Sequence, residues 1–243
     1  MPKMILFDYG QTLVNEAFDG IRGTEAVLKF AVKNKYHMSA AQVQSEAEKI
    51  NRELGRFDPE RRHLFQIEVP NHMFTAYLYE SLGIELSLSA EQIDQVFWDA
   101  AAPGVPTNGI EKFLSYLHQS GVRTGVISNI SYAGKVVANR INEVIPANQF
   151  EFILATSEYM YRKPNRHIFE LALEKAGLPA SEVWYVGDQY KCDIVGARNA
   201  GIFPVWYLGA IDTKMEEDDE VCKISDWGEL QDLLEELQYG KEI

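Results

Sequence analysis

The chain is poor in cysteine and has no long apolar segment. Its 243 residues include only two cysteines, Cys192 and Cys222, whose separation matches neither a zinc site nor a disulfide framework. So few cysteines are typical of a reducing compartment. The first residues also show no basic stretch followed by an apolar run, the pattern of a secretory signal peptide, so a cytoplasmic protein is expected. No apolar run approaches the ~20 residues that a membrane-spanning helix requires, so no membrane partner is expected.

Basic residues are also scarce relative to acidic ones. The chain has 23 Lys and Arg against 36 Asp and Glu, which gives a formal net charge of -13. A surface this acidic repels phosphate backbones, so nucleic acid and anionic membranes are not expected partners. An anionic substrate remains possible, because a bound cation can reverse the field inside a cleft. Nothing in the sequence indicates an oligomeric state.

The apolar pattern divides the chain into two kinds of region. The apolar run at residues 4–7 predicts a strand buried on both faces. Residues 15–102 have helical patterns throughout, with capping boxes opened by Ser39 and Ser89, and no strand is expected there. After Pro103 short apolar strands alternate with helices, a pattern typical of right-handed crossovers and a mainly parallel sheet.

These patterns predict an α/β fold with a doubly wound, mainly parallel, Rossmann-like sheet. Residues 1–14 and 103–243 would form this core, and residues 15–102 an inserted all-helical cap domain. The 46% of hydrophobic residues is sufficient for one such domain with an insertion.

Polar residues follow four of the predicted strands at their carboxyl ends. In open parallel sheets this edge is where ligands bind. In chain order the residues are Asp8; Ser128 and Asn129; Arg162, Lys163 and Pro164 after a short loop; and Gly187 and Asp188, with Asp193 five residues later. Each alone is more typical of a turn, a helix cap or a solvated loop. Their order at successive strand ends is what indicates a site.

Together these side chains are suited to phosphoryl transfer. Asp8 can attack phosphorus and form an acyl phosphate, which splits hydrolysis into two easier steps. Mg²⁺, held by Asp8 and Asp188 with Asp193 as a further candidate ligand, would remove the repulsion between the nucleophile and a phosphate dianion. Lys163 can neutralise charge on Asp8 and on the phosphoryl group, while Ser128 Oγ and the Asn129 backbone N–H can donate to phosphoryl oxygens.

The ordered set resembles the haloacid dehalogenase-like hydrolase superfamily over nearly the whole chain. That family's Asp-x-Asp-x-Thr motif stands here as Asp8-Tyr9-Gly10-Gln11-Thr12, followed by the strand-end Ser128, the pair Lys163-Pro164, and Gly187-Asp188 with Asp193. A helical insertion between the first two motifs is similar to the subclass with an α-helical cap.

The resemblance implies a Mg²⁺-dependent hydrolase of a small phosphorylated substrate. Its catalytic residues would be Asp8, Ser128 and Lys163, and the substrate would contact Ser128, Asn129 and Lys163. The metal ligands would be Asp8, the backbone carbonyl of Gly10, Asp188 and Asp193, the last directly or through water.

Gly10 departs from the family pattern. Phosphatases of this family carry a second Asp there, which protonates the leaving oxygen and later activates water. Such help is typically worth about 10²–10⁴ in rate. Glycine keeps the backbone carbonyl but has no proton to transfer. The sequence therefore predicts an aspartyl-phosphate enzyme without its usual acid, restricted to good leaving groups or using another acid.

Candidates for such an acid are few in the sequence. Tyr9 follows the nucleophile, but its side chain should point to the opposite face of the strand from that of Asp8. Four residues of the insertion could enter the site on closure: His37, His63, His72 and Glu68.

Two other functions remain open. Phosphonoacetaldehyde hydrolases of this family also lack the second Asp and cleave a carbon–phosphorus bond through a cap lysine, for which Lys49 is the candidate. Its charged neighbours Glu46, Glu48 and Arg52 indicate a solvated helix face instead. A degenerate member could bind a phosphorylated ligand or a partner without turnover, although such a site has no need of the nucleophile Asp8. Haloacid dehalogenases need no metal, and the Asp188–Asp193 pair argues against that branch.

Overall fold

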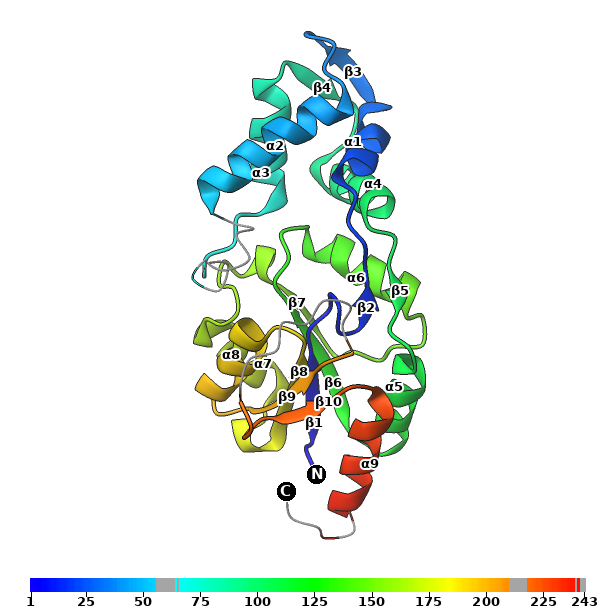
Figure 1. Cartoon of the computed structure of the whole chain (residues 1–243), viewed down its shortest axis with the longest axis vertical. Coiled ribbons are helices and arrows are strands. Elements are labelled where there is room, and N and C mark those ends of the chain that lie inside the picture. Colours follow the sequence, from blue (N-terminus) through cyan, green and yellow to red (C-terminus); the bar gives the residue numbers. More distant parts are fainter. Residues whose placement is uncertain (56–63, 65, 210–217, 239, 241–243) are drawn as a thin grey trace.

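A six-stranded sheet lies at the centre of the lower part of the molecule (Figure 1). The computed structural model describes residues 1–55, 64, 66–209, 218–238 and 240. In sheet order the strands are β10 (Cys222–Ile224), β9 (Phe203–Tyr207), β8 (Val183–Gly187), β1 (Met4–Phe7), β6 (Arg123–Ser128) and β7 (Ile153–Ala155). Every neighbouring pair is parallel, which confirms the predicted sheet.

Helices cover both faces of this sheet. Ile5 and Phe7 of β1 point into one apolar cluster, and Met4 and Leu6 into the other, as strand alternation requires. The first cluster contains residues of α5 (Ile110–Gln119), α6 (Gly134–Val144) and α9 (Trp227–Gln238); the second contains residues of α7 (Arg166–Ala176) and α8 (Val195–Asn199). The sheet is therefore doubly wound, and β1 at its centre is fully buried.

The chain between β1 and β6 contains a helical unit with an apolar cluster of its own. Its helices are α1 (Gly20–Leu28), α2 (Ala40–Leu54), α3 (Asn71–Ser81) and α4 (Ala90–Ala101). Val27, Val43 and Leu78 are buried in that cluster. Ser39 and Ser89 make both hydrogen bonds of the predicted capping boxes. Figure 1 shows this unit beyond the end of the sheet, separate from the helices that cover its faces.

The prediction that residues 15–102 contain no strand is wrong. Strands β3 (Ala31–Asn34) and β4 (Ile84–Leu86) pair antiparallel inside the helical unit, and α1 ends at Leu28. Strands β2 (Val14–Asn15) and β5 (Val105–Pro106) pair where the chain enters and leaves the unit. Both pairings join segments at least fifty residues apart, so periodicity within one segment could not reveal them.

Short helical turns complete the described structure. They are η2 (Thr156–Glu158), η3 (Ala180–Glu182) and η4 (Tyr190–Ile194), the last a π-helical turn that runs directly into α8. Among the described helices, none combines the length and the apolar character needed to cross a bilayer.

Candidate active site

Lys163 joins three polar groups at the carboxyl end of the sheet. Its Nζ donates to Asp8 Oδ1, to Asp193 Oδ1 and to the Tyr185 hydroxyl oxygen, each at 2.6 Å. The lysine is 1% exposed, and both carboxylates are buried. Residues predicted from three separate strand ends thus converge on one ammonium group.

Burial and charge set the protonation of this cluster. Burial raises the pKa of Asp8 to about 6, against the opposing effect of the Lys163 ammonium. For Lys163, burial alone would lower the pKa, but Asp193 and Asp8 together hold it above its ordinary range. The lysine therefore stays charged at neutral pH. Two buried carboxylates share one positive charge, which leaves the cluster negative once Asp8 ionises.

Asp188 completes a set of carboxylates that could hold a cation. One oxygen of each of Asp8, Asp188 and Asp193 lies within 4.8 Å of the others. Thr12 Oγ1 donates to Asp188 Oδ1 at 3.5 Å, from the loop that follows β1. Carboxylate oxygens in a negatively charged site are the donors that Mg²⁺ prefers, so the residues fit the predicted metal.

Asp193 also has a positioning role. Its Oδ1 accepts from Lys163 and, at 3.2 Å, from the Tyr185 hydroxyl, while its Oδ2 accepts from the Gln189 N–H at 2.9 Å. With both oxygens engaged, the side chain is suited to holding Lys163 in place. Gly187 makes room for it, since a Cβ there would lie 2.4 Å from Asp193 Cγ.

Tyr185 is a member of the cluster that the strand-end pattern did not predict. It lies within β8, and its buried hydroxyl also lies 3.2 Å from the backbone oxygen of Ile127, to which it can donate. Burial raises the pKa of Tyr185 well above its ordinary value, so the phenol remains neutral. A tyrosine in the middle of an otherwise apolar buried strand was the available signal, because a buried hydroxyl needs a partner.

Asn129 acts through its side chain. Its Nδ2 donates to the Lys163 backbone oxygen at 2.9 Å, and its Oδ1 accepts from the Lys163 N–H at 2.8 Å. This reciprocal pair fixes the loop that carries the lysine. Ser128 is buried at the end of β6, which neighbours β1 in a register that pairs Phe7 with Val126. The predicted contacts of Ser128 Oγ and of the Asn129 N–H with a phosphoryl group stay predictions.

Gly10 lies half-buried in the loop after Asp8. A Cβ built on it would meet no atom within 4 Å. The left-handed conformation in this loop belongs instead to Gln11, at φ 62°. Position 10 therefore has room for a side chain, and its glycine is not required by the backbone. That the Gly10 carbonyl faces a metal stays a prediction.

Comparison with known proteins assigns the family. The model of the haloacid dehalogenase-like hydrolases matches residues 2–201. The chain belongs to this family.

Individual relatives agree with this assignment. The chain is 31% identical to the pyrimidine 5'-nucleotidase YjjG of Escherichia coli over 53% of its own length and 56% of that protein's. It is 30% identical to the glyceraldehyde 3-phosphate phosphatase of Pyrococcus abyssi over 41% of each. The chain thus spans about half the length, or less, of these curated relatives. A 2-haloacid dehalogenase from Pseudomonas syringae shares the fold, with a TM-score of 0.67, 22% identity, and coverage of 98% of this chain and 100% of that one.

The residues suggested above as a substitute acid are, among those that the structure describes, either exposed or hydrogen-bonded to other groups. Tyr9 is buried on the other face of β1 and donates to Glu16 Oε1 at 2.6 Å. His37 and His72 are exposed, and His63 lies outside the described residues. Glu68 is buried, where it accepts from Thr156 Oγ1 at 2.8 Å and pairs with Arg162.

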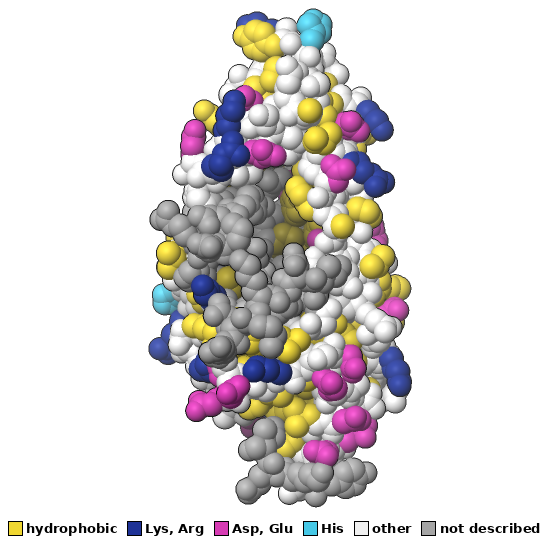
Figure 2. All heavy atoms as spheres, viewed as in Figure 1, with side chains coloured by type: hydrophobic (Ala, Val, Ile, Leu, Met, Phe, Trp, Pro, Cys, Tyr) yellow, Lys and Arg dark blue, Asp and Glu magenta, His cyan; other side chains and the backbone are white. Residues whose placement is uncertain are grey.

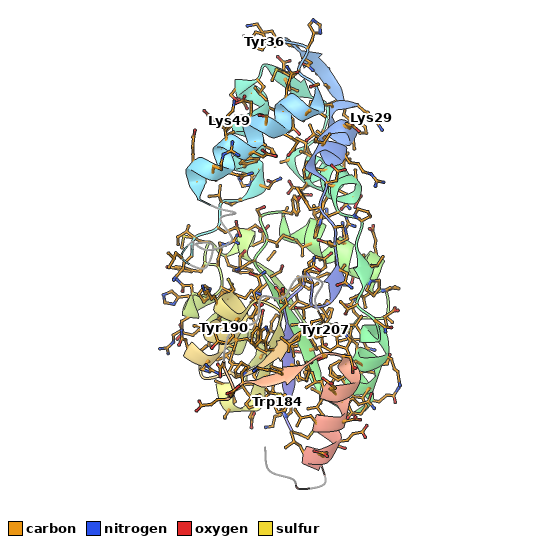
Figure 3. All side chains as sticks on the ribbon, in the orientation of Figure 1. Lys29, Tyr36, Lys49, Trp184, Tyr190 and Tyr207 are labelled. Atoms are coloured by element: carbon orange, nitrogen blue, oxygen red, sulfur yellow. The ribbon has the colours of Figure 1, made fainter. Side chains whose placement is uncertain are left out.

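Lys49 does not reach the site. Its side chain is 54% exposed and pairs with Glu46 at 2.5 Å. Figure 3 shows Lys49 on α2 in the helical unit, far from the sheet.

A cleft of about 1700 Å³ separates the helical unit from the sheet's carboxyl edge. Its side nearest the sheet is lined by Gln11 and Arg162, three residues from Asp8 and one from Lys163, and by Asn129, which follows Ser128. Residues of all four helices of the unit line the other side. On the face of the molecule drawn in Figure 2, the surface is hollowed, and hydrophobic side chains lie along the hollow.

Proposed function

We propose that this chain is a Mg²⁺-dependent phosphatase-type hydrolase that acts on a small phosphorylated substrate through an aspartyl-phosphate on Asp8. The observation that carries the proposal is the buried cluster of Asp8, Lys163 and Asp193, with Asp188 near enough to share a cation. Phosphatases and a nucleotidase among the relatives support the same class of reaction.

Each residue has a part in this reaction. The Asp8 carboxylate attacks phosphorus, and Lys163 neutralises charge on Asp8 and on the incoming phosphoryl oxygens. Ser128 Oγ and the Asn129 N–H would orient those oxygens. Mg²⁺, when held by Asp8, Asp188, the Gly10 carbonyl and Asp193 directly or through water, supplies further neutralisation of the phosphate charge. Asp193 and Tyr185 keep the ammonium pointed at Asp8.

Gly10 restricts the choice of substrate. Without an acid at this position, the leaving oxygen departs as an anion, which favours phosphates with weakly basic leaving groups. In this proposal the helical unit, residues 15–102, is the cap, and residues 1–14 and 103–243 form the catalytic core. The cleft beneath the cap would hold the rest of the substrate.

The two alternatives have less support. An exposed, ion-paired Lys49 is unsuited to imine formation, which needs a desolvated amine. A site that only binds a phosphorylated ligand has no use for an ammonium held against a nucleophilic carboxylate.

Acetyl phosphate tests the proposal, because its leaving group needs no proton. We expect hydrolysis that requires Mg²⁺, stops in EDTA and disappears in Asp8→Asn. Asp232→Asn, an exposed position on α9, is the matched control and should retain full activity. An Asp8→Asn variant that still hydrolyses acetyl phosphate, or a wild type that binds phosphate without turnover, would overturn the proposal.

A further inference from the structure

Aromatic side chains line much of the cleft and form what we call the aromatic wall. Phe18 and Phe97 lie with their ring centroids 6.0 Å apart, and Trp98 stacks on Tyr132 at 4.7 Å. Phe74 lines the same cleft. These rings come from the segment before α1, from α3 and α4, and from the loop after β6, so the fold gathers them around one space.

Part of this apolar surface is exposed to solvent. Phe18 is 68% exposed, and Ile21, Leu54 and Leu64 on the same cleft are exposed as well. Large apolar side chains gathered in a cleft beside a reactive cluster are typical of a binding site for an apolar group. The volume of the cleft also exceeds the roughly 300–1,000 Å³ that is usual for small-molecule sites. A three-carbon phosphate would leave most of it unfilled.

The charges that line the cleft are mainly negative. Four of the described lining residues are acidic, namely Glu16, Asp19, Glu48 and Glu53, and two are basic, Arg52 and Arg162. Arg162 pairs with Glu68, and Arg52 lies 3.7 Å from Glu48. A leaving group with a carboxylate or a second phosphate would be repelled here. The cleft therefore suits a neutral group.

The missing acid at Gly10 adds a second, independent constraint. An aliphatic leaving group departs as an alkoxide, which is about as strong a base as hydroxide. A phenol is far less basic, with a pKa of about 10 as in tyrosine. A leaving group that is both apolar and weakly basic is therefore an aromatic alcohol.

We propose that the cleft holds the uncharged aromatic leaving group of an aryl phosphate monoester, so that this enzyme is an aryl phosphatase. This inference rests on the proposed function. The Asp8 carboxylate oxygen forms a bond to phosphorus, the phosphorus–oxygen bond to the ring breaks, and its electron pair leaves on a phenolate, which takes a proton from water. Water then attacks the acyl phosphate, which restores Asp8 and releases phosphate and a proton.

Phenyl phosphate and benzyl phosphate form the decisive pair of substrates. Both carry one uncharged ring, but only phenyl phosphate has a phenol as its leaving group. We expect kcat for phenyl phosphate to exceed that for benzyl phosphate by at least about 100-fold. Benzyl phosphate should instead inhibit competitively, with a Ki near the KM of phenyl phosphate, because its ring still binds. Equal turnover of the two esters, or no inhibition by benzyl phosphate, would overturn the inference.

Variants in the wall test the binding of the ring. Phe18→Ala should lower the ratio of kcat/KM for 1-naphthyl phosphate to that for acetyl phosphate by about three- to tenfold, since one exposed ring contact is lost. Tyr36→Ala is the matched control. Tyr36 is 58% exposed on the far end of the helical unit (Figure 3), and its removal should leave the ratio unchanged. An unchanged ratio in Phe18→Ala would contradict the role of the wall.

Acetyl phosphate separates the two proposals. If the wild type hydrolyses acetyl phosphate through Asp8 but does not prefer aryl over alkyl esters, only the aryl inference fails. If acetyl phosphate is not hydrolysed either, the proposed function fails and the inference fails with it.

Discussion

At the scale of single residues, Lys163 decides the electrostatics of the site. Its ammonium is removed from water and has three oxygens at 2.6 Å as partners. A buried ammonium is stable only when it is paired and hydrogen-bonded, and here two carboxylates and a phenol meet that need. In the proposed mechanism Asp8 is the nucleophile, so the same contacts would hold the reactive carboxylate in position.

The burial of Asp8 predicts a pH-dependent effect of Asp8→Asn on stability. In the folded, metal-free protein the pKa of Asp8 is about 6, above the 3.8 of an ordinary aspartate. The folded state thus binds the proton more tightly than the unfolded state, so this group lowers the free energy of unfolding as pH rises from about 4 to 6. Asparagine cannot ionise, so the free energy of unfolding of Asp8→Asn does not fall in this way as pH rises.

We therefore expect the stability of Asp8→Asn relative to wild type to increase by about 1 kcal/mol between pH 5 and pH 8. Urea unfolding in the presence of EDTA measures it. The exposed control Asp232→Asn should show a flat difference over the same range. A flat difference for Asp8→Asn as well would mean that burial does not raise the pKa of Asp8.

Gly10 is the residue whose replacement should add function. A side chain there meets no atom within 4 Å at its Cβ. We expect Gly10→Asp to raise kcat/KM for benzyl phosphate by about 10²-fold, because it supplies the missing proton transfer. Gly10→Ala adds the Cβ without the acid and should leave the rate unchanged. An unaltered rate in Gly10→Asp, with the fold and Mg²⁺ binding intact, would count against this account of the missing acid.

At the scale of elements, the turn η4 brings Asp193 back under the end of β8. Because a Cβ at Gly187 would lie 2.4 Å from Asp193 Cγ, this approach needs glycine at the last position of the strand. We expect Gly187→Ala to displace Asp193 and lower kcat for acetyl phosphate by at least about tenfold, since Lys163 loses one of its two carboxylates.

Gly10→Ala is the matched comparison for this variant. It adds the same methyl group near the same cluster, but in open space. Circular dichroism should show both variants folded. Full activity in Gly187→Ala would show that Asp193 tolerates displacement and does not position the lysine.

At the scale of the whole molecule, the segment before α3 ties the helical unit to the loop that carries Lys163. Glu68 N donates to the Met160 oxygen at 2.6 Å, and Arg162 N to the Gln66 oxygen at 2.9 Å. Between these bonds the buried Glu68 carboxylate pairs with Arg162. Arg162, which lines the cleft, thus takes part in a cross-link between the two parts of the chain.

A double-mutant cycle measures this cross-link. Glu68→Ala removes a buried carboxylate that accepts from both Arg162 and Thr156, so we expect it alone to lower the free energy of unfolding by about 3 kcal/mol. Combined with Arg162→Ala, it should show a coupling energy above about 1 kcal/mol. The exposed pair Lys33–Glu85 is the control, with an expected coupling near zero. Similar coupling in the two pairs would contradict the difference in burial.

Sequence patterns by themselves determined that the core is a mainly parallel sheet, the order of its strand-end residues and the two capping boxes. These features depend on neighbours along the chain: a strand buried on both faces needs a continuous apolar run, and a helix start needs a cap at fixed spacing. The convergence of Asp8, Lys163 and Asp193 also followed, because the carboxyl ends of parallel strands share one edge.

Only the tertiary structure decided which groups touch. The pairings of β3 with β4 and of β9 with β10 join segments whose partners local periodicity does not identify. The contact of Tyr185 with Lys163, the ion pair of Glu68 and the aromatic wall around Phe18 depend on distances between remote residues. Sequence spacing fixes which face of an element a side chain occupies, but packing between elements fixes its partner, and here that packing positions the lysine and shapes the cleft.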